Sequence, residues 1–441
     1  YPRPGPGWGR GGVGGGGVCA VRGPRGGRGG WGAARPPPDS SRRALRYDRC
    51  MDHDAHEMTE QTSPPAPAAP RIAIFGLGTV GTAVAARLLD PAWAEAVAAR
   101  GLPVPRLVGV ADRDLDLERD LALSADVRQV TDYTELLGDD VDVVVELMGG
   151  AGVAGEAVLA AFAAGTSVVT ANKDLVARRG TELESAAREA GVALRFEAAV
   201  RAGVPVRGPL VGELCAARVS DVRGIFNGTT NYILSTMAAE AREYEDVLAE
   251  AQARGYAESD PVSDVEGFDA AYKLVLLSRL AWDGWVPIDE VRRSVPVVGA
   301  EPADGITGVK RSHLSVAARL GLAIKLVARA ERNGEGIRGA VTPMAVAAGS
   351  PLGTTAGVTK LVEITADPVE RVSMAGPGAG GPPTSSAILA DVLALGMGAG
   401  STWGRLPAAG DMAIEDDLAA ERGWLVVVEG MGQAGFPEQV K

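Results

Sequence analysis

Apolar and polar positions alternate along this chain with two different periods. From Arg71 onward, short apolar runs that predict buried strands are separated by longer segments in which apolar residues recur with a helical period. The predicted elements are the strands Ile72–Phe75, Leu107–Ala111, Val141–Glu146, Ser167–Thr170 and Ala193–Phe196, and a first helix at Gly81–Leu89. Strands that alternate with helices are typical of a doubly wound parallel sheet of Rossmann type, so we expect an α/β domain over residues 71–199.

The pattern changes after about Val200. The predicted helices Tyr232–Glu240 and Asp269–Trp282, and the apolar periodic segment Leu314–Arg332, alternate there with short strands. Residues 200–375 therefore predict a second domain of the α+β class.

Residues 376–395 combine a glycine-rich turn with one more helix. The turn is Gly376–Gly381, and the helix is predicted over Thr384–Leu395 with Thr384 as its N-cap. We expect this segment to return to the first domain. In residues 396–441 only Trp424–Glu429 has the pattern of a strand.

The first 70 residues have a different composition from the rest. Residues 1–50 are rich in Gly, Arg and Pro, without a strand or helix period, and predict disorder; an Arg/Gly-rich RNA-binding arm is the alternative interpretation. The chain begins with Tyr1, and its first methionines are Met51 and Met58. The simplest expectation is that translation starts at Met51, with a stiff linker over residues 59–70.

Composition and charge exclude several classes of protein. The 441 residues have a formal net charge of −12 although residues 1–50 are basic, so the part that folds is strongly acidic and is not expected to bind nucleic acid. The three cysteines are far apart in the sequence, which excludes a disulfide framework and suits the cytoplasm. No apolar run reaches the ~18 residues of a membrane span, so no membrane partner is expected.

The first motif is Gly-Leu-Gly-Thr-Val-Gly, directly after the first predicted strand. In a strand–turn–helix context this spacing predicts a dinucleotide site, with the phosphates at the helix N-terminus. The candidate cofactor residues of the motif are Gly76, Gly78, Thr79, Val80 and Gly81. Asp112 and Arg113 end the second strand, where an acid suits the 2′-hydroxyl of NAD(H) and an arginine the 2′-phosphate of NADP(H). Both are present, so the choice stays open, with a preference for NADP(H).

An acidic segment leads into the helix predicted at Asp269. Five acids lie between Gly255 and Lys273, and Asp269 and Lys273 are spaced to share one helix face. Such a segment suits an amino-acid ammonium group and a proton donor, whereas the alternative is a solvated loop with a surface ion pair. Lys173 follows the fourth strand at the ligand edge of the sheet, or only begins a helix. The polar turn Asn227–Asn231 is either a ligand site or a helix cap.

Taken together, these segments resemble the homoserine dehydrogenase family. The similar motifs, in the family's order between Arg71 and Leu395, are GLGTVG, VVTANKDLVA, FEAAVRAGVPV, GIFNGTTNYIL, GYAESDPVSDVEGFDAAYK and GPGAGGPPTSSAILADV. The resemblance implies NAD(P)-dependent interconversion of L-aspartate 4-semialdehyde and L-homoserine, on the route to threonine, methionine and isoleucine. It also implies that residues 200–375 bind the substrate and form the contact of a homodimer or homotetramer.

The resemblance further implies roles for single residues. Lys273 falls on the catalytic proton donor, and Lys173 on a second lysine that holds the substrate near the nicotinamide. The other implied assignments are Glu258, Asp264 and Asp269 for the substrate's amino end, Gly255 and Gly378 for the cofactor, and Glu197, Val200, Ala202 and Val204 for a monovalent cation such as Na⁺. Arg201 departs from the small residue usual in the family, which weakens the cation assignment.

The segment after residue 395 is a second departure from the family pattern. Many bacterial members continue into a regulatory ACT domain, and residues 396–441 are too short for a complete one, so we expect weak or no inhibition by threonine. Two rival interpretations stay open. One is a two-domain NAD(P) oxidoreductase that acts on a different small acid. The other is a non-catalytic nucleotide sensor, against which the presence of both Lys173 and Lys273 argues.

Overall fold

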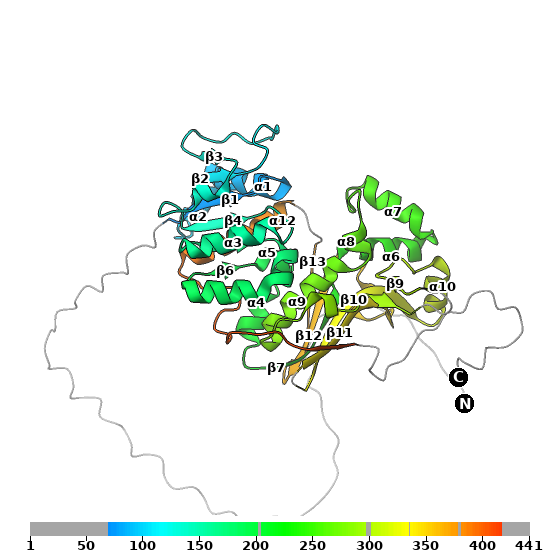
Figure 1. Ribbon diagram of the computed structural model, residues 1–441. Coiled ribbons are helices and arrows are strands. Elements are labelled where there is room, and N and C mark those ends of the chain that lie inside the picture. The colour runs from blue at the N-terminus through cyan, green and yellow to red at the C-terminus, as the bar shows by residue number, and fades with distance from the viewer. Residues whose placement is uncertain (1–68, 202–203, 297–300, 335, 378–380, 417–441) are drawn as a thin grey trace, which may run out of the picture. The chain divides into compact units, whose positions relative to one another are not determined.

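The structure is a computed structural model that describes residues 69–201, 204–296, 301–334, 336–377 and 381–416 (Figure 1). The sequence predictions for residues 1–50, for most of the linker and for Trp424–Glu429 lie outside these residues. Up to residue 201 the elements are β1 Arg71–Phe75, α1 Thr79–Leu88, α2 Pro91–Ala98, β2 Arg106–Ala111, β3 Arg128–Val130, β4 Val143–Glu146, α3 Val153–Ala163, β5 Ser167–Thr170, α4 Lys173–Ala190, β6 Leu194–Arg195 and α5 Glu197–Arg201.

A second set of elements follows. It consists of β7 Arg218–Ile225, α6 Gly228–Glu240, α7 Tyr244–Ala253, α8 Val262–Val265, α9 Phe268–Trp282, β8 Ser294–Val295, β9 Ala303–Asp304, α10 Arg311–Arg319, β10 Leu322–Asn333, β11 Gly336–Ala347, α11 Pro351–Thr354, β12 Lys360–Asp367, β13 Glu370–Gly376, α12 Gly381–Gly396 and β14 Ile414–Asp416.

The first sheet is parallel, with strand order β3-β2-β1-β4-β5-β6. This is the order of a Rossmann sheet, in which the crevice for a ligand lies at the carboxyl ends of β1 and β4. The prediction of a doubly wound α/β domain is confirmed. All five predicted strands are present within about two residues of their predicted ends. Only β3 was not predicted, because its residues Arg128–Val130 are polar and mostly exposed at the edge.

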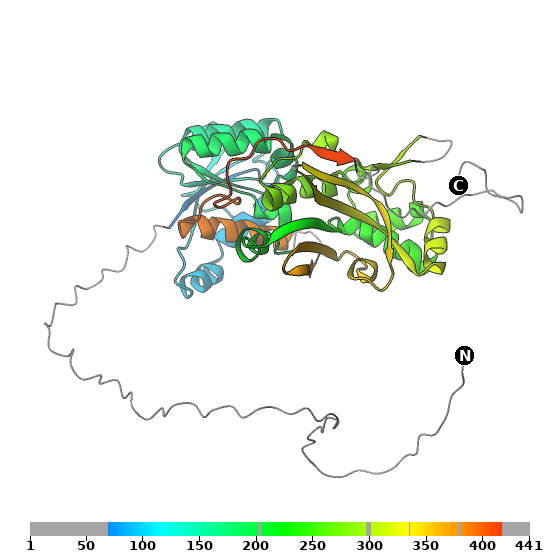
Figure 2. The same cartoon turned by 90° about the horizontal axis from the view of Figure 1, so that it is seen from below.

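Helices cover both faces of this sheet. Ile72 and Ile74 of β1 pack with Val84 of α1 and with Ile388 and Val392 of α12 in one core cluster. Ala73 and Phe75, which point to the opposite face, belong to the main core with residues of α3 and α4. The helix α12 comes from the far end of the chain but lies beside α1 in both views (Figures 1 and 2). A buried ion pair of 2.8 Å between Arg195 of β6 and Asp391 of α12 fixes it there.

The second sheet is mixed, with order β13-β12-β7-β10-β11-β14 (Figure 2). The prediction of a second domain that mixes helices and strands is confirmed, but its strands are not short, since β10 and β11 have 12 residues each. The segment Leu314–Arg332, predicted as one periodic element, divides at Gly321, whose φ of +72° ends the helical part. Leu322–Asn333 is strand because its alternating apolar side chains fit one buried face of a sheet.

Three helix starts differ from the predicted ones. α6 begins at Gly228 because Asn227 caps it, with its side chain accepting from the backbone N–H of Thr230 at 2.8 Å. α1 begins at Thr79, two residues before the predicted start. α12 begins at Gly381, so the prediction that Thr384 is its N-cap was wrong.

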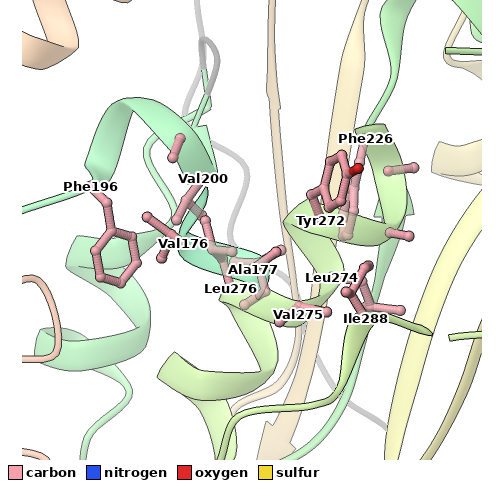
Figure 3. Close-up of a cluster of buried hydrophobic side chains, with 14 of the residues drawn as sticks. Val176, Ala177, Phe196, Val200, Phe226, Tyr272, Leu274, Val275, Leu276 and Ile288 are labelled. Carbon is pink, nitrogen blue, oxygen red and sulfur yellow. The ribbon is translucent and has the colours of Figure 1, made fainter. Parts of the chain in front are cut away.

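Helix α9 is buried on all sides, since every residue from Asp269 to Leu280 is buried. Its apolar side chains meet Val176 of α4 and Val200 of α5 in the cluster that Figure 3 shows. A helix that is apolar all round is buried, and α9 lies between the second sheet and the helices α4 and α5 of the first domain.

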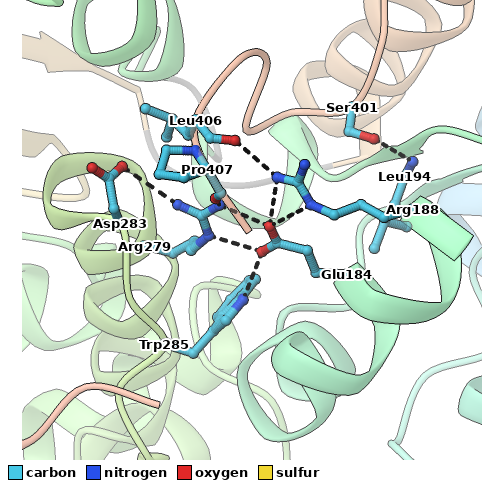
Figure 4. A network of polar contacts seen from close by, with 9 residues as sticks. All are labelled: Glu184, Arg188, Leu194, Arg279, Asp283, Trp285, Ser401, Leu406 and Pro407. Atoms are coloured by element: carbon cyan, nitrogen blue, oxygen red, sulfur yellow. Dashed lines mark hydrogen bonds and ion pairs between the residues drawn. The ribbon is translucent and has the colours of Figure 1, made fainter. Parts of the chain in front are cut away.

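The other half of α9 carries a buried charge network. Arg279 donates to both carboxylate oxygens of Glu184 on α4, at 2.8 Å each, and to the carbonyl of Pro407 (Figure 4). Trp285 and Arg188 donate to the same carboxylate. Burial works against ionisation of Glu184, but Arg279 and Arg188 hold its pKa below the usual value. The network joins α4, α9 and the segment after α12.

We expect Glu184→Gln to lower the free energy of unfolding by about 3 kcal/mol, because it leaves the buried charge of Arg279 with only the half-exposed carboxylate of Asp283, at 3.6 Å, as its counter-charge. Urea unfolding followed by circular dichroism measures this. The control is Asp126→Asn, which removes the exposed ion pair with Arg106 and should leave the midpoint unchanged. Equal midpoints for the two variants would contradict the role of the network.

Candidate active site

The three glycines of Gly-Leu-Gly-Thr-Val-Gly differ in what surrounds the position of a side chain. Gly76 has φ +99°, and a Cβ there would lie 2.7 Å from the carbonyl oxygen of Leu147. A Cβ at Gly81 would lie 2.0 Å from the carbonyl oxygen of Gly76. Gly78 is exposed, and a Cβ there would meet nothing within 4 Å. The first and third glycines thus serve the turn itself, whereas the second leaves open space above it.

The open space at Gly78 lies at the N-terminus of α1, which begins with Thr79 and Val80. The backbone N–H groups of a helix start favour an anion, and a missing Cβ allows a pyrophosphate to approach the backbone. The loop therefore fits a dinucleotide. Thr79 is exposed and Val80 half-buried, so both border this space.

Asp112, at the end of β2, is already engaged by the protein. Its carboxylate accepts from the backbone N–H of Leu77 at 2.6 Å and forms an ion pair of 3.1 Å with Arg119. Arg119 also donates to the carbonyl of Leu77, so two side chains hold the glycine-rich turn. Arg113, the predicted 2′-phosphate residue, is exposed beside them.

Polar side chains line the carboxyl ends of β4 and β5. Thr170 donates to the buried carboxylate of Glu146 at 2.6 Å, and its own oxygen accepts from the N–H of Asn172. Asn172 then caps α4, which places Lys173 as the first residue of that helix. Lys173 thus begins a helix, as one interpretation of the sequence had it, and also reaches the second half of the chain.

The centre of the site is the carboxylate of Asp269, in the first turn of α9. Its oxygen Oδ2 accepts from Lys273 Nζ at 2.5 Å and from the amide of Asn227 at 2.9 Å, and Oδ1 pairs with Lys173 Nζ at 3.3 Å. Two lysines from two helices and one amide thus meet on one buried carboxylate. The alternative interpretation, a surface ion pair between Asp269 and Lys273, was wrong, since both side chains are under 10 % exposed.

The burial of these groups sets their protonation. Burial works against ionisation of Asp269, yet Lys273 and Lys173 hold its pKa well below the usual range. Asp269 in turn raises the pKa of Lys173. Asp264 lies next to this group, and both burial and the charge of Asp269 raise its pKa. The site thus keeps Asp269 ionised and Lys173 protonated, while it resists a second negative charge at Asp264.

Asn227 serves as helix cap and as site residue at once. Its carbonyl oxygen caps α6, while its amide nitrogen donates to Asp264 at 2.7 Å as well as to Asp269. The helix-cap interpretation of the polar turn Asn227–Asn231 is therefore confirmed for its first residue, and the ligand-site interpretation stays a prediction. Lys273 completes the arrangement by donating to the carbonyl of Phe226 at 2.9 Å.

The other predicted site residues lie at varied positions. Glu258 is exposed, and its backbone carbonyl accepts from Gln252. Gly255 has φ +70° and ends α7, which is a sufficient local reason for glycine there. The predicted cation residues Glu197, Val200 and Val204 are buried in and after α5. Gly378 and Ala202 lie outside the described residues.

Two residues of the site were missed by sequence reasoning. Glu146 ends the apolar strand VVVE, where a single buried acid after three valines was a usable signal. Lys360 opens the strand KLVEITAD and is only 4 % exposed, and its ammonium group interacts with Asp269, Lys273 and Lys173. A lysine as the first residue of an apolar strand was a weak sequence signal, and only the fold shows that it lies near α9.

Two protein-family models match the sequence of this chain. The model described as "Homoserine dehydrogenase, NAD binding domain" matches residues 76–197, and the one described as "Homoserine dehydrogenase" matches residues 205–393. Together they span well over half of the chain. The chain belongs to the homoserine dehydrogenase family. The resemblance stated from the sequence motifs is thereby confirmed.

Individual relatives agree with this assignment. The homoserine dehydrogenase of Synechocystis sp. is 39% identical over 328 residues, which is 73% of this chain and 72% of the relative. That of Bacillus subtilis is 36% identical over 74% of this chain and 72% of the relative. Among solved structures, the homoserine dehydrogenase of Thiobacillus denitrificans has a TM-score of 0.69 and 35% identity, and the match covers 79% of this chain and 80% of that one.

Membership of the homoserine dehydrogenase family includes a nicotinamide cofactor and a small-molecule substrate. In the described residues, no group of three or more His, Cys, Asp and Glu side chains is arranged to hold a metal ion. No helix in those same ranges is long and apolar enough to cross a membrane.

The loop geometry of this homoserine dehydrogenase homologue predicts that one glycine substitution weakens cofactor binding and another lowers stability. Gly78→Ala should fold normally but fill the open space, which raises the Kd for the dinucleotide about tenfold, or by about 1.4 kcal/mol. Gly81→Ala should instead lower the free energy of unfolding by about 1–3 kcal/mol, because its Cβ collides with backbone. Nucleotide fluorescence titration and urea unfolding separate the two effects. A Gly78→Ala protein with unchanged Kd would exclude the loop as the cofactor site.

Proposed function

We propose that this chain catalyses the NAD(P)-dependent interconversion of L-aspartate 4-semialdehyde and L-homoserine. The observation that supports it most is the convergence of Lys173 and Lys273 on the buried carboxylate of Asp269. The first lysine comes from the helix after β5, at the ligand edge of the nucleotide-binding sheet, and the second from α9. Two ammonium groups are thus held where the two halves of the chain meet.

Reduction of an aldehyde builds negative charge on its oxygen as the carbon accepts a hydride. A bound nicotinamide supplies that hydride. Lys273 donates a proton to the oxygen, and the ammonium group of Lys173 stabilises the charge while it develops. Both effects need fixed geometry, and the contacts of Lys273 with Asp269 and with the carbonyl of Phe226 hold its nitrogen in place.

Other acids of the site serve the amino end of the substrate in this proposal. Asp269 already contacts Lys173, Lys273 and Asn227, so we assign it mainly to holding the lysines. Asp264 and Glu258, on the segment before α9, then bind the ammonium group of the substrate. A substrate cation near Asp264 would offset the charge of Asp269, which otherwise raises the pKa of Asp264.

For the cofactor we propose NADP(H). Arg119 neutralises Asp112 at the end of β2, so the acid offers less repulsion to a 2′-phosphate, while the exposed Arg113 is placed to attract one. A related solved structure, a hyperthermophilic archaeal homoserine dehydrogenase in complex with NADPH, has 25% identity and a TM-score of 0.58 over 75% of this chain and 98% of that one.

The remaining features of the proposal come from the family resemblance. They are a homodimer or homotetramer, a cytoplasmic location and a site for a monovalent cation such as Na⁺. The burial of Glu197, Val200 and Val204, in and after α5, supports the cation site, because buried backbone carbonyls can serve as cation ligands.

The central assay uses the purified full chain with homoserine and NADP⁺, or with aspartate semialdehyde and NADPH. Lys273→Ala should lower kcat by about 10²–10⁴-fold, because it removes the proton donor, and should leave the Kd for NADPH unchanged. The matched control is Lys310→Ala, an exposed lysine at the start of α10. Near-wild-type turnover by Lys273→Ala would refute the assignment of the proton donor, and a wild-type protein that acts on other aldehydes alone would refute the substrate.

Arg113→Ala tests the cofactor proposal. It should lower kcat/KM for NADP(H) about tenfold by removing a charge-assisted contact, with no change for NAD(H). Arg100→Ala, at an exposed position after α2, is the control for a general loss of positive charge. An equal loss with both cofactors would exclude a contact with the 2′-phosphate.

A further inference from the structure

Lys360 is a third lysine of the site, and strand geometry places it. Side chains of a strand alternate between the two faces of a sheet. In β12, Val362 and Ile364 belong to the main core with α9, whereas Leu361 packs with Ile225 in a separate cluster on the other face. Lys360 shares the face of Val362 and Ile364, so its side chain extends toward α9.

The register of β12 and β7 places Lys360 more closely. Leu361 lies opposite Ile225, so Lys360 comes beside Phe226, the next residue of the neighbouring chain segment. The carbonyl of Phe226 is the group that accepts a hydrogen bond from Lys273 at 2.9 Å. The two lysines thus approach the same point from β12 and from α9.

The charges around Lys360 come from two helices. Lys273 and Asp269 face it from α9, and Lys173 faces it from α4, while Asp264 of α8 acts on Asp269 and Lys273. The site therefore holds three lysines against one strongly ionised carboxylate and a second whose pKa is raised. Two ammonium groups close together in a buried site repel strongly. Burial and the neighbouring charge of Lys273 lower the pKa of Lys360 to about 7.

We propose that Lys360 and Lys273 share a single positive charge at neutral pH, and that Lys360 is the positioning residue that lets Lys273 both donate and accept a proton. This inference rests on the proposed function. A lone lysine beside a carboxylate would stay protonated near pH 7 and could not serve as a base. A second cationic group nearby is a known way to make a lysine amine available.

The proton balance of the two directions then closes. When homoserine is oxidised, a hydride leaves its hydroxyl-bearing carbon for the oxidised nicotinamide, and the hydroxyl proton goes to the neutral amine of Lys273. The pair rises from one positive charge to two and returns to one by releasing a proton. In the reduction of the aldehyde, the pair takes up a proton from solvent, gives one proton to the oxygen as the carbon accepts the hydride, and returns to a single positive charge.

Replacing Lys360 should change the pH dependence of homoserine oxidation, and the direction depends on whether the new side chain is charged. Without a charge at residue 360, the repulsion that favours a single positive charge on the pair is gone, so the pH at which homoserine oxidation sets in rises. With a permanent charge at residue 360 the repulsion remains, so that pH does not rise. Loss of packing alone would not distinguish a neutral from a charged substitute.

The experiment measures kcat/KM for homoserine with saturating NADP⁺ between about pH 6 and 10, in the full chain. For Lys360→Met we expect the acid limb of the kcat/KM profile to move to higher pH by about one to two units. At pH 7 this lowers kcat/KM about tenfold to hundredfold, and the loss is recovered at high pH. For Lys360→Arg we expect a limb at or below the wild-type position. Lys360→Gln repeats the neutral substitution with a polar side chain, in case Lys360→Met does not fold.

The matched control is Lys325→Met. Lys325 is a second buried lysine of the same sheet, but its ammonium group donates to Asn231, Ser235 and the carbonyl of Thr355, and burial lowers its pKa to about 8. Its replacement should leave the limb at the wild-type pH. Circular dichroism and NADPH binding verify that each variant is folded.

Two results would overturn the shared charge. One is an acid limb of the kcat/KM profile that stays at the wild-type pH in Lys360→Met and Lys360→Gln. The other is an acid limb that moves to higher pH in Lys360→Arg as far as it does in Lys360→Met. Failure of the proposed function looks different, because the wild-type protein would then oxidise no homoserine at any pH.

Discussion

The charged residues of α9 depend on partners from other segments, because the helix is buried on every side. Asp269 and Lys273 lie in its first turns and Arg279 lies two turns further on, all in an otherwise apolar helix. A buried ion without a counter-charge costs several kcal/mol, so each of these groups constrains the element that faces it. Arg279 draws α4 to the helix through Glu184, and Asp269 draws the start of α4 through Lys173. The same helix thus fixes both the packing of α4 against the second sheet and the arrangement of the charged groups of the candidate site.

The three lysines of the candidate site lie on helices and a strand. Lys173 is the first residue of α4, Lys273 is inside α9, and Lys360 begins β12, so none of the three belongs to a long loop. The carboxylate between them is held in turn by Asn227, the cap of α6. Preorganised dipoles and charges of this kind stabilise a developing charge without rearrangement during the reaction. The contacts that stabilise the core and those that hold the candidate site therefore involve the same helix, α9.

The sequence predicted local features far better than long-range ones. The strands of the first sheet could be predicted because they are buried on both faces and so consist of unbroken apolar runs, and the glycine motif had one interpretation in its strand–turn–helix context. Lys173 and Asp269 were both singled out, but nothing local indicated that they meet. Lys360 was missed because its environment comes from α9 and α4, each far away in the sequence. Likewise, the periodic segment Leu314–Arg332 misled because a short apolar run is compatible with either helix or strand until its partners are known.

The position of α12 also has a consequence for synthesis of the chain. Ile388 and Val392 cover the face of β1 that carries Ile72 and Ile74, and Asp391 pairs with Arg195. About 200 residues separate β6 from this helix, and they form the second sheet and its helices. At about 5–20 residues per second, a ribosome needs about ten seconds or more to make them, and during that time one face of the first sheet has α1 but lacks the part of its cover that α12 supplies. The nucleotide domain is therefore completed late, and a nascent chain stalled inside the second domain would expose apolar surface that chaperones recognise.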